Sequence, residues 1–370
     1  MKAGSLLEKT LFFANAKVGR FMPARLRRRF ARRLYPPGAA KPKMLVVDIV
    51  GSCNLRCPSC PVGNMGLGVN PVGMMDKAVF ERIVLKAKRE YDVKIVALYN
   101  WTEPFLHPEL SQFIKIVKNE GLVCAISTNL NKLRNIDEVL SAGLDIFRIS
   151  LSGFTQENYG VTHVRGDIER VKENMRLVSE AIKRVGAPTV VEVYFHKYLH
   201  NLGEVEPMRR YVASLGFEWL ESWAYYMPME KVLALTEGQL TESEADFVEN
   251  RLALPIGHAV EAAMGQQGYN RCSLLQDQIV LDHLGNVNLC CTVYDFKKNG
   301  LGNFLEMSGD DLKSSKRRHP TCDTCVSKGL HKYFVYFDIP ELKEKYERLA
   351  ETKVEEREAL AQGAGSRSIG

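Results

Sequence analysis

The sequence lacks any apolar run that approaches the roughly 20 residues needed to span a bilayer. Its first residues are partly apolar, but Glu8, Lys9 and Lys17 interrupt them, so they do not match the apolar core of a signal peptide. Extremes of charge and of apolar content are also absent, which argues against a disordered or fibrous chain. We therefore expect a cytoplasmic protein whose 370 residues form one large or two medium domains.

The nine cysteines are an odd number, and seven of them fall in tight clusters. In a reducing compartment, this clustering favours metal binding over disulfide bonds. The first cluster is Cys53, Cys57 and Cys60, with the spacing C-x3-C-x2-C. Three close thiolates suit a soft metal or an iron–sulfur cluster, and three ligands on a cubane leave one iron open for chemistry. Free thiols are the alternative, but this loop is rich in polar and turn residues, whereas free Cys is usually buried.

A second set contains four cysteines, two of them spaced C-x2-C, and would form a closed site with all ligands from protein: Cys272, Cys290, Cys322 and Cys325. Spacing alone leaves zinc and iron–sulfur equally open. Cys291 adjoins Cys290 and cannot easily point the same way, so it is either a buried thiol or a hydrogen-atom donor or alternative ligand. Cys124 lies in an apolar strand and is expected in the core.

Strand-like and helix-like segments alternate along the first two thirds of the chain. Apolar strand-like runs occur at 44–50, 94–99, 122–127, 146–151, 189–195 and 217–224. Helical patterns occur at 76–90, 108–120, 134–142, 167–185 and 204–215. Six such units predict an α/β fold with a parallel sheet, but they are too few for an eight-stranded barrel, so we expect a partial (β/α)6 TIM-like barrel.

Polar residues follow these strands at the ends where ligands bind in such folds. They are the cysteine loop, the segment 100–104, Ser127, Asn129, Ser150, Ser152, Tyr194, His196 and Lys197. For Tyr194, His196 and Lys197 a structural or solvated role is favoured over catalysis. Glu192 is a plausible substrate ligand if it faces the barrel interior, but a slip of one residue would reverse its face.

The C-terminal third differs in pattern. Thr241 and Glu244 form a capping box that opens a helix, and the runs 279–282 and 287–289 flank a turn that predicts a β-hairpin. A charged helix at 340–362 and a disordered Gly/Ser tail follow. We thus expect a barrel at 44–250, a small hairpin and helix domain at 251–340, and the helix and tail at 341–370.

Residues 1–43 contain twelve Lys or Arg and one acidic residue, a net charge of +11, so the rest of the chain carries −5. The interleaved apolar residues predict an amphipathic helix. Its Arg face is either solvated while the helix packs on the main domain, or binds an anionic membrane surface, which would make the protein peripheral at the inner membrane. Nucleic acid is not expected as a partner, because the aromatic residues of a stacking surface are missing.

Together these residues resemble the radical S-adenosylmethionine (SAM) enzymes, in the branch with a SPASM or twitch C-terminal domain. Cys53, Cys57 and Cys60 match the family's cluster loop, and Thr102-Glu103-Pro104 matches the loop that holds the SAM amino group. The sequence differs from the family pattern at Ser59, where an aromatic residue is frequent, and at Trp101 and Thr102, where two glycines are usual.

The resemblance implies a set of cofactors and contacts. Cys53, Cys57 and Cys60 would hold the SAM-binding [4Fe–4S] cluster, and the second cysteine set would hold an auxiliary [4Fe–4S] cluster. Contacts to SAM are implied for Thr102, Glu103, Ser127, Asn129, Ser150 and Ser152. A flavodoxin- or ferredoxin-type protein would supply the electron.

The resemblance also implies reductive cleavage of SAM to a 5′-deoxyadenosyl radical that takes a hydrogen atom from a substrate. The outcome would be an oxidation, or an epimerisation in which Cys291 returns hydrogen. A sugar, an aminocyclitol, or a nucleotide- or lipid-linked sugar is the favoured substrate. The alternatives are maturation of a ribosomal peptide and, from a different class, a non-catalytic zinc-braced binding protein.

Overall fold

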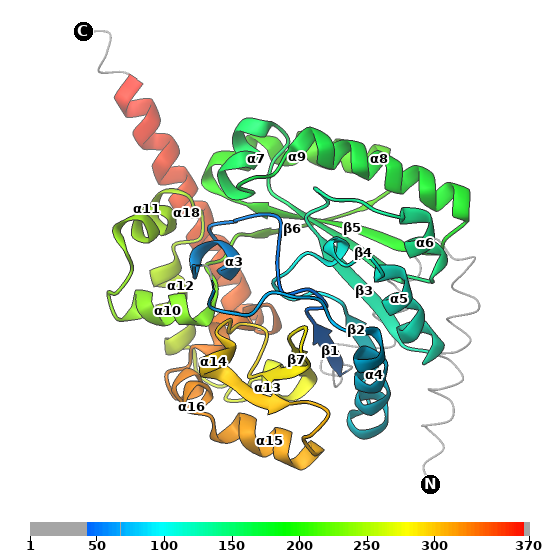
Figure 1. Ribbon diagram of the computed structural model, residues 1–370. Coiled ribbons are helices and arrows are strands. Elements are labelled where there is room, and N and C mark those ends of the chain that lie inside the picture. Colours follow the sequence, from blue (N-terminus) through cyan, green and yellow to red (C-terminus); the bar gives the residue numbers. More distant parts are fainter. Residues whose placement is uncertain (1–42, 67, 366–370) are drawn as a thin grey trace, which may run out of the picture.

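The central feature of the structure, a computed structural model that describes residues 43–66 and 68–365, is a nine-stranded sheet (Figure 1). Its strand order is β6-β5-β4-β3-β2-β1-β7-β8-β9. The first six strands are all parallel, and they are β1 (Met44–Val47), β2 (Ile95–Ala97), β3 (Val123–Thr128), β4 (Ile146–Leu151), β5 (Val190–Lys197) and β6 (Glu218–Trp223). Each predicted strand is therefore confirmed, within a few residues at its ends.

Helices connect successive parallel strands and, apart from the short α3 in the cysteine loop, lie along the outside of the sheet (Figure 1). They are α3 (Pro61–Asn64), α4 (Lys77–Tyr91), α5 (Leu110–Asn119), α6 (Ile136–Ser141), α7 (Gln156–Thr162), α8 (Ile168–Val185) and α9 (Val205–Ser214). Both ends of α8 are capped. At the N-terminus the Asp167 side chain accepts from the Arg170 amide, and at the C-terminus Gly186 adopts the left-handed conformation, φ 65°. The predicted partial (β/α)6 barrel is confirmed.

Alternation along the strands separates an outer core from the barrel interior. In β5, Val191, Val193 and Phe195 are buried against the helices. Their neighbours Glu192 and Tyr194 point the other way, as the two-residue period of a strand requires. The polar residues of the later strands thus line the inside of the barrel.

The C-terminal third adds a hairpin to this sheet and a second apolar core. The predicted hairpin is present as β7 (Gln278–Leu281) and β8 (Asn286–Asn288), extended by β9 (Gly300–Asn303). β7 pairs in parallel with β1, so that Met44 lies opposite both Ile95 and Gln278. The hairpin therefore continues the barrel sheet, an arrangement the sequence analysis did not anticipate.

The second core is formed mainly by helices of this third. The helices of this third are α10 (Met229–Thr236), α11 (Glu242–Asn250), α12 (Ile256–Gly265), α13 (Ser273–Asp277), α14 (Phe296–Asn299), α15 (Gly309–Arg318), α16 (Pro320–Ser327), α17 (His331–Phe334) and α18 (Pro340–Gly365). All but α14 and α15 contribute to the second core, and Leu312 of α15 packs in the first one. The capping box predicted at Thr241 and Glu244 is present at the start of α11.

Two predictions concern the ends of the chain. The predicted amphipathic helix lies within residues 1–42, and the last part of the predicted tail, residues 366–370, also lies outside the described residues. Among the helices of the described residues, none is both long and apolar enough to cross a membrane.

Candidate functional site

The cysteine loop follows β1 at the edge of the sheet where the parallel strands end. It is folded by its own backbone: the Cys60 amide donates to the Cys57 carbonyl at 3.0 Å, and the Gly63 amide donates to the Cys60 carbonyl at 2.9 Å. The Arg56 guanidinium donates to the Cys53 carbonyl at 2.8 Å. A Cβ atom on Gly63 would lie 2.2 Å from the Cys57 carbonyl oxygen, so only glycine allows the loop to close this tightly.

The three thiols of this loop lie in surroundings that disfavour free thiolates. Burial raises the pKa of Cys53 and of Cys60 to about 12, and it raises the pKa of Cys57 well above the ordinary value. A metal centre supplies the positive charge that such thiolates lack, and it binds them only when they lose their protons. Three soft sulfur donors at this position fit an iron–sulfur cluster.

A cavity of about 360 Å³ lies beside the three cysteines, within the size range of small-molecule sites. Of the residues singled out from the sequence, it is lined by Cys53, Cys57, Cys60, Thr102, Glu103, Ser127, Asn129, Ser150, Tyr194 and His196. The structure thus brings together residues from the ends of five strands. Ser152 is not among the lining residues: it is fully buried, with its hydroxyl 2.8 Å from Nδ1 of His163.

Asp48, at the end of β1, holds the loop that follows β2. Its Oδ1 accepts from the amides of Asn100 at 2.8 Å, Trp101 at 3.1 Å and Thr102 at 3.2 Å, and from the Thr102 hydroxyl at 2.6 Å. Burial raises the pKa of Asp48 to about 6 even though these hydrogen bonds lower it. One carboxylate therefore orders a loop in which Trp101 and Thr102 occupy the places of two glycines.

Glu103 directs its carboxylate into the protein. Its oxygens accept from the Thr128 hydroxyl at 2.7 Å, the Asn129 amide at 2.9 Å and the Phe105 amide at 3.1 Å. Burial raises its pKa to about 7. These bonds join the loop after β2 to the end of β3, where the Asn129 side chain reaches the Cys53 sulfur at 3.6 Å. The carboxylate is thus arranged to position other groups.

The far wall of the cavity is polar and comes from β4 and β5. The Ser150 hydroxyl lies 3.1 Å from Nε2 of His196, and burial lowers the pKa of this imidazole to about 4, so it is neutral at pH 7. Arg148 donates to Glu192 at 2.9 Å and stacks on the Tyr194 ring, 5.4 Å from its centroid. Glu192 does face the interior, where it is paired with an arginine.

Cys291 is not among the lining residues of this cavity. It packs against the interior residues Val46, Ala97 and Val280, as does Tyr99, whose side chain lines the cavity. Burial raises the pKa of its thiol. The expected role of Cys291 as a hydrogen-atom donor stays a prediction.

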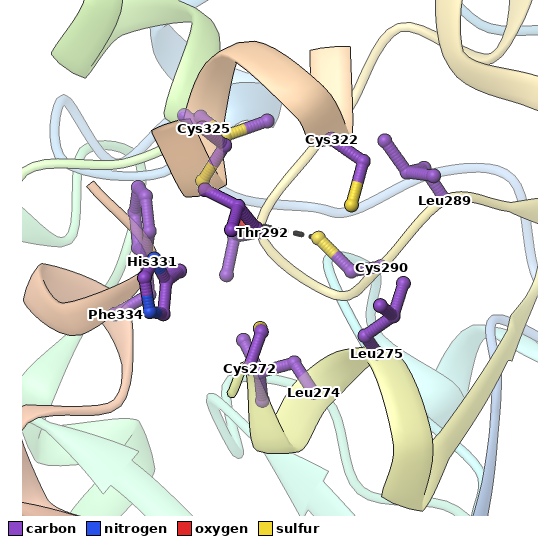
Figure 2. A pocket seen from close by; sticks show the side chains of 12 residues that line it. Cys272, Leu274, Leu275, Leu289, Cys290, Thr292, Cys322, Cys325, His331 and Phe334 are labelled. Carbon is purple, nitrogen blue, oxygen red and sulfur yellow. Dashed lines mark hydrogen bonds between the residues drawn. The ribbon is translucent and has the colours of Figure 1, made fainter. Parts of the chain in front are cut away.

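The second cysteine set surrounds a small apolar cavity of about 30 Å³ (Figure 2). Cys272 precedes α13, Cys290 follows β8, and Cys322 and Cys325 lie on α16. Burial raises the pKa of each of these thiols, to about 11 for Cys272. The four sulfurs therefore come from three separate segments that meet only in the folded chain.

The lining of this second cavity also contains an orphaned polar atom. His331 is 2% exposed; its Nε2 lies 2.9 Å from the Tyr269 carbonyl, and Nδ1 has no partner among the described residues. Four soft donors and an unsatisfied nitrogen around one cavity fit a bound metal centre. In the part of the chain that the structure describes, no three Cys, His, Asp or Glu side chains gather closely enough for a single metal ion.

The segment 290–296 connects the two cysteine sites. The Trp101 indole donates to the Val293 carbonyl at 3.3 Å, and the Asn70 side chain donates to the Tyr294 carbonyl at 2.6 Å. Glu230 fixes the same segment by accepting from the amides of Tyr294 and Asp295. The second set is thus tied to the loop beside the first.

Several lining residues had not been identified as site residues from the sequence: Tyr99, Tyr198, Ser222, Trp223, Tyr225 and Met227. Tyr198 is the most informative, since its hydroxyl lies 2.9 Å from that of Ser59 and its ring is almost fully buried. Tyr198 thus places an aromatic ring next to Ser59, at the position where the family often has an aromatic residue.

Asp48 could have been identified from the sequence, because it is a single polar residue that interrupts an apolar strand.

The comparisons with known proteins agree with this geometry. The Radical SAM superfamily matches residues 47–200. The tungsten-containing aldehyde ferredoxin oxidoreductase cofactor-modifying protein of Pyrococcus furiosus is 26% identical over 209 residues, 54% of this chain and 54% of that protein. A 7,8-dihydro-6-hydroxymethylpterin dimethyltransferase of Methanocaldococcus jannaschii is 26% identical over 174 residues, 45% of this chain and 33% of that protein. The chain thus spans about half the length of the first relative and a third of the second.

Solved structures show the same fold. SuiB of Streptococcus suis bound to S-adenosylmethionine has a TM-score of 0.52 at 12% identity, covering 81% of this chain and 71% of that chain. SuiB bound to precursor peptide SuiA gives a TM-score of 0.51 at 12% identity, with 81% and 70% covered.

Proposed function

Since the Radical SAM superfamily matches residues 47–200, we propose that this chain is a radical SAM enzyme, with a [4Fe–4S] cluster and SAM as cofactors, that abstracts a hydrogen atom from a small polar metabolite. The bound cofactors supply a 5′-deoxyadenosyl radical for this step. We propose Cys53, Cys57 and Cys60 as ligands of the first cluster, and Cys272, Cys290, Cys322 and Cys325 as ligands of an auxiliary cluster in residues 251–340. A flavodoxin- or ferredoxin-type reductant would supply the electron.

The observation that supports a polar substrate is the composition of the wall opposite the cysteine loop. Ser150, Tyr194, His196, Ser222 and Tyr225 line it, and they offer hydroxyl groups, a neutral imidazole and aromatic faces. Hydroxyl groups on a ligand would find both donors and acceptors here, and aromatic rings would cover its apolar faces. We therefore favour a sugar, an aminocyclitol, or a nucleotide- or lipid-linked sugar, with oxidation or epimerisation as the outcome.

The names of the curated relatives favour a small substrate as well. One relative is named for modifying a cofactor of an oxidoreductase, and the other is named for methylating a hydroxymethylpterin. One name thus refers to a cofactor and the other to a pterin. Because this chain covers only part of each relative, a pterin-like heterocycle joins the sugars as a substrate class to be tested.

A ribosomal peptide is the second candidate substrate. It is favoured by the fold shared with SuiB, which has been seen bound to precursor peptide SuiA. Contact between the basic N-terminal residues and an anionic lipid surface or a lipid-linked substrate is a further part of the proposal.

The test uses anaerobically reconstituted protein reduced with dithionite in the presence of SAM. We expect 5′-deoxyadenosine from the wild type and none from C53A. Substrate class is then assigned by supplying deuterated sugars, pterins or a peptide and measuring deuterium in the 5′-deoxyadenosine. Transfer from a peptide and from no small molecule would refute the small-molecule proposal, and absence of 5′-deoxyadenosine under all conditions would refute the reaction itself.

A further inference from the structure

Cys290 of the second cysteine set has a side-chain hydrogen bond at its sulfur, whereas among the described residues the Cys272 sulfur receives hydrogen bonds from the backbone amides of Leu274 and Leu275. The Thr292 hydroxyl lies 3.1 Å from the Cys290 sulfur (Figure 2). Thr292 is 4% exposed, and no other partner of its hydroxyl is found in the described part of the chain. A thiolate has no proton to give, so once Cys290 is a ligand the hydroxyl must be the donor.

The position of Thr292 is fixed by its backbone. Its carbonyl accepts from the Met229 amide at 2.7 Å, which ties it to the start of α10. The hydroxyl is therefore held toward the sulfur by the fold, with little freedom to turn to water. Hydrogen bonds to cluster sulfurs are among the features that set the reduction potential of iron–sulfur centres.

A buried lysine is hydrogen-bonded to the residue that ends α13, the helix that Cys272 precedes. Lys316, in the last turn of α15, is 3% exposed, and its Nζ donates to the Gln278 carbonyl at 2.6 Å. Burial lowers its pKa, while the nearby Cys290, Cys291, Cys272 and Cys322 sulfurs raise it, so these sulfurs are within electrostatic reach. No carboxylate within salt-bridge distance of Lys316 is found among the described residues, so its charge is left to face the thiolates.

We infer that Thr292 and Lys316 are positioning residues that raise the reduction potential of the auxiliary centre, so that it accepts an electron from the substrate side of the reaction. This inference rests on the proposed auxiliary cluster. A donated hydrogen bond and a buried positive charge both stabilise the extra electron of a reduced cluster, because they offset its added negative charge. An easily reduced centre is what a net oxidation requires, whereas an epimerisation has no net electron to remove.

The experiment isolates the auxiliary centre in the full-length chain. In a C53A/C57A/C60A background, iron and sulfide are counted after anaerobic reconstitution, and the reduced cluster is followed by EPR during a redox titration. T292V, which keeps the shape of the side chain and removes the hydroxyl, should shift the reduction equilibrium about tenfold toward the oxidised form, or 59 mV for one electron. K316M should shift it in the same direction.

The controls separate a change of potential from a change of fold. T292S keeps a hydroxyl and should restore the wild-type midpoint, and K353M removes another buried lysine, on α18, and should leave the midpoint unchanged. Unchanged midpoints in T292V and K316M, with full iron content, would overturn the inference while leaving the auxiliary cluster in place. Absence of iron from the triple-cysteine background would instead refute the auxiliary cluster itself.

Discussion

The carboxylate of Asp48 should make the stability of the protein fall as the pH rises through the mildly acidic range. The residue is 6% exposed, and its pKa is raised from 3.8 to about 6, mainly by burial. A group that holds its proton more tightly in the folded state stabilises the fold at low pH. Its contribution is therefore full below pH 3.8 and is lost as the pH rises through about 6.

The size of the effect follows from the same shift. A rise of the pKa from 3.8 to about 6 corresponds to roughly 3 kcal/mol. D48N cannot titrate, yet its side-chain oxygen can still accept from the amides of Asn100 and Thr102. The free energy of unfolding of the wild type should thus decrease by up to about 3 kcal/mol relative to D48N between pH 4 and pH 7.

The assay is urea denaturation of the reduced, metal-free protein at several pH values, followed by both fluorescence and circular dichroism. Glu103 also has a raised pKa, but it is present in both proteins, so its contribution cancels in the comparison. E103Q serves as the second variant. It should remove the pH dependence of the free energy of unfolding that Glu103 contributes, which extends to about pH 7. Parallel curves for the wild type and D48N between pH 4 and pH 7 would refute the reasoning.

The remaining predictions concern the cysteine loop and the N-terminus. G63A should lower the iron content of the first site at least severalfold, because its Cβ would lie 2.2 Å from the Cys57 carbonyl oxygen. The control G257A, where a Cβ would meet open space, should keep full iron content. Equal loss of iron in both variants would contradict the assignment. C53A should abolish 5′-deoxyadenosine formation and lower the iron content by one cluster per chain. C124A, at a fully buried position of β3, should retain both activity and iron. An inactive C124A with full iron content would show that the loss of activity is not specific to cysteines of the loop. Deleting residues 1–40 should weaken co-sedimentation with anionic vesicles and leave binding to neutral vesicles unchanged, and unaltered binding to anionic vesicles would favour a helix packed on the main domain.

The elements of this fold are readable from the sequence because their signals are local. The apolar runs of β4 and β5 and the capping box of α11 depend only on neighbouring residues, and both were predicted. The pairing of β1 with β7 is different, because it joins Met44 to Gln278 across most of the chain and has no local signal. Long-range pairing must be inferred from the packing of the whole sheet.

The candidate site likewise has features that local sequence predicts and features that depend on the fold. Its cysteines and the positions after the strands followed from spacing, and the structure places most of them around one cavity. The tasks of Asp48 and Glu103 could not be read in this way, since each depends on amides brought near by folding. Ser152 illustrates the limit: it has the right residue type at the right strand end, but its hydroxyl is turned to His163.

The pairing of β1 with β7 has a consequence for co-translational folding of the protein. β1 can pair with β2 soon after it is made, but its other edge stays open until residues 278–281 have left the exit tunnel. An unpaired strand edge is a template for association between chains, and contacts of high sequence separation form slowly. Nascent chains with this topology should therefore depend on chaperone protection late in synthesis, and truncation before residue 278 should favour aggregation over a stable half-protein.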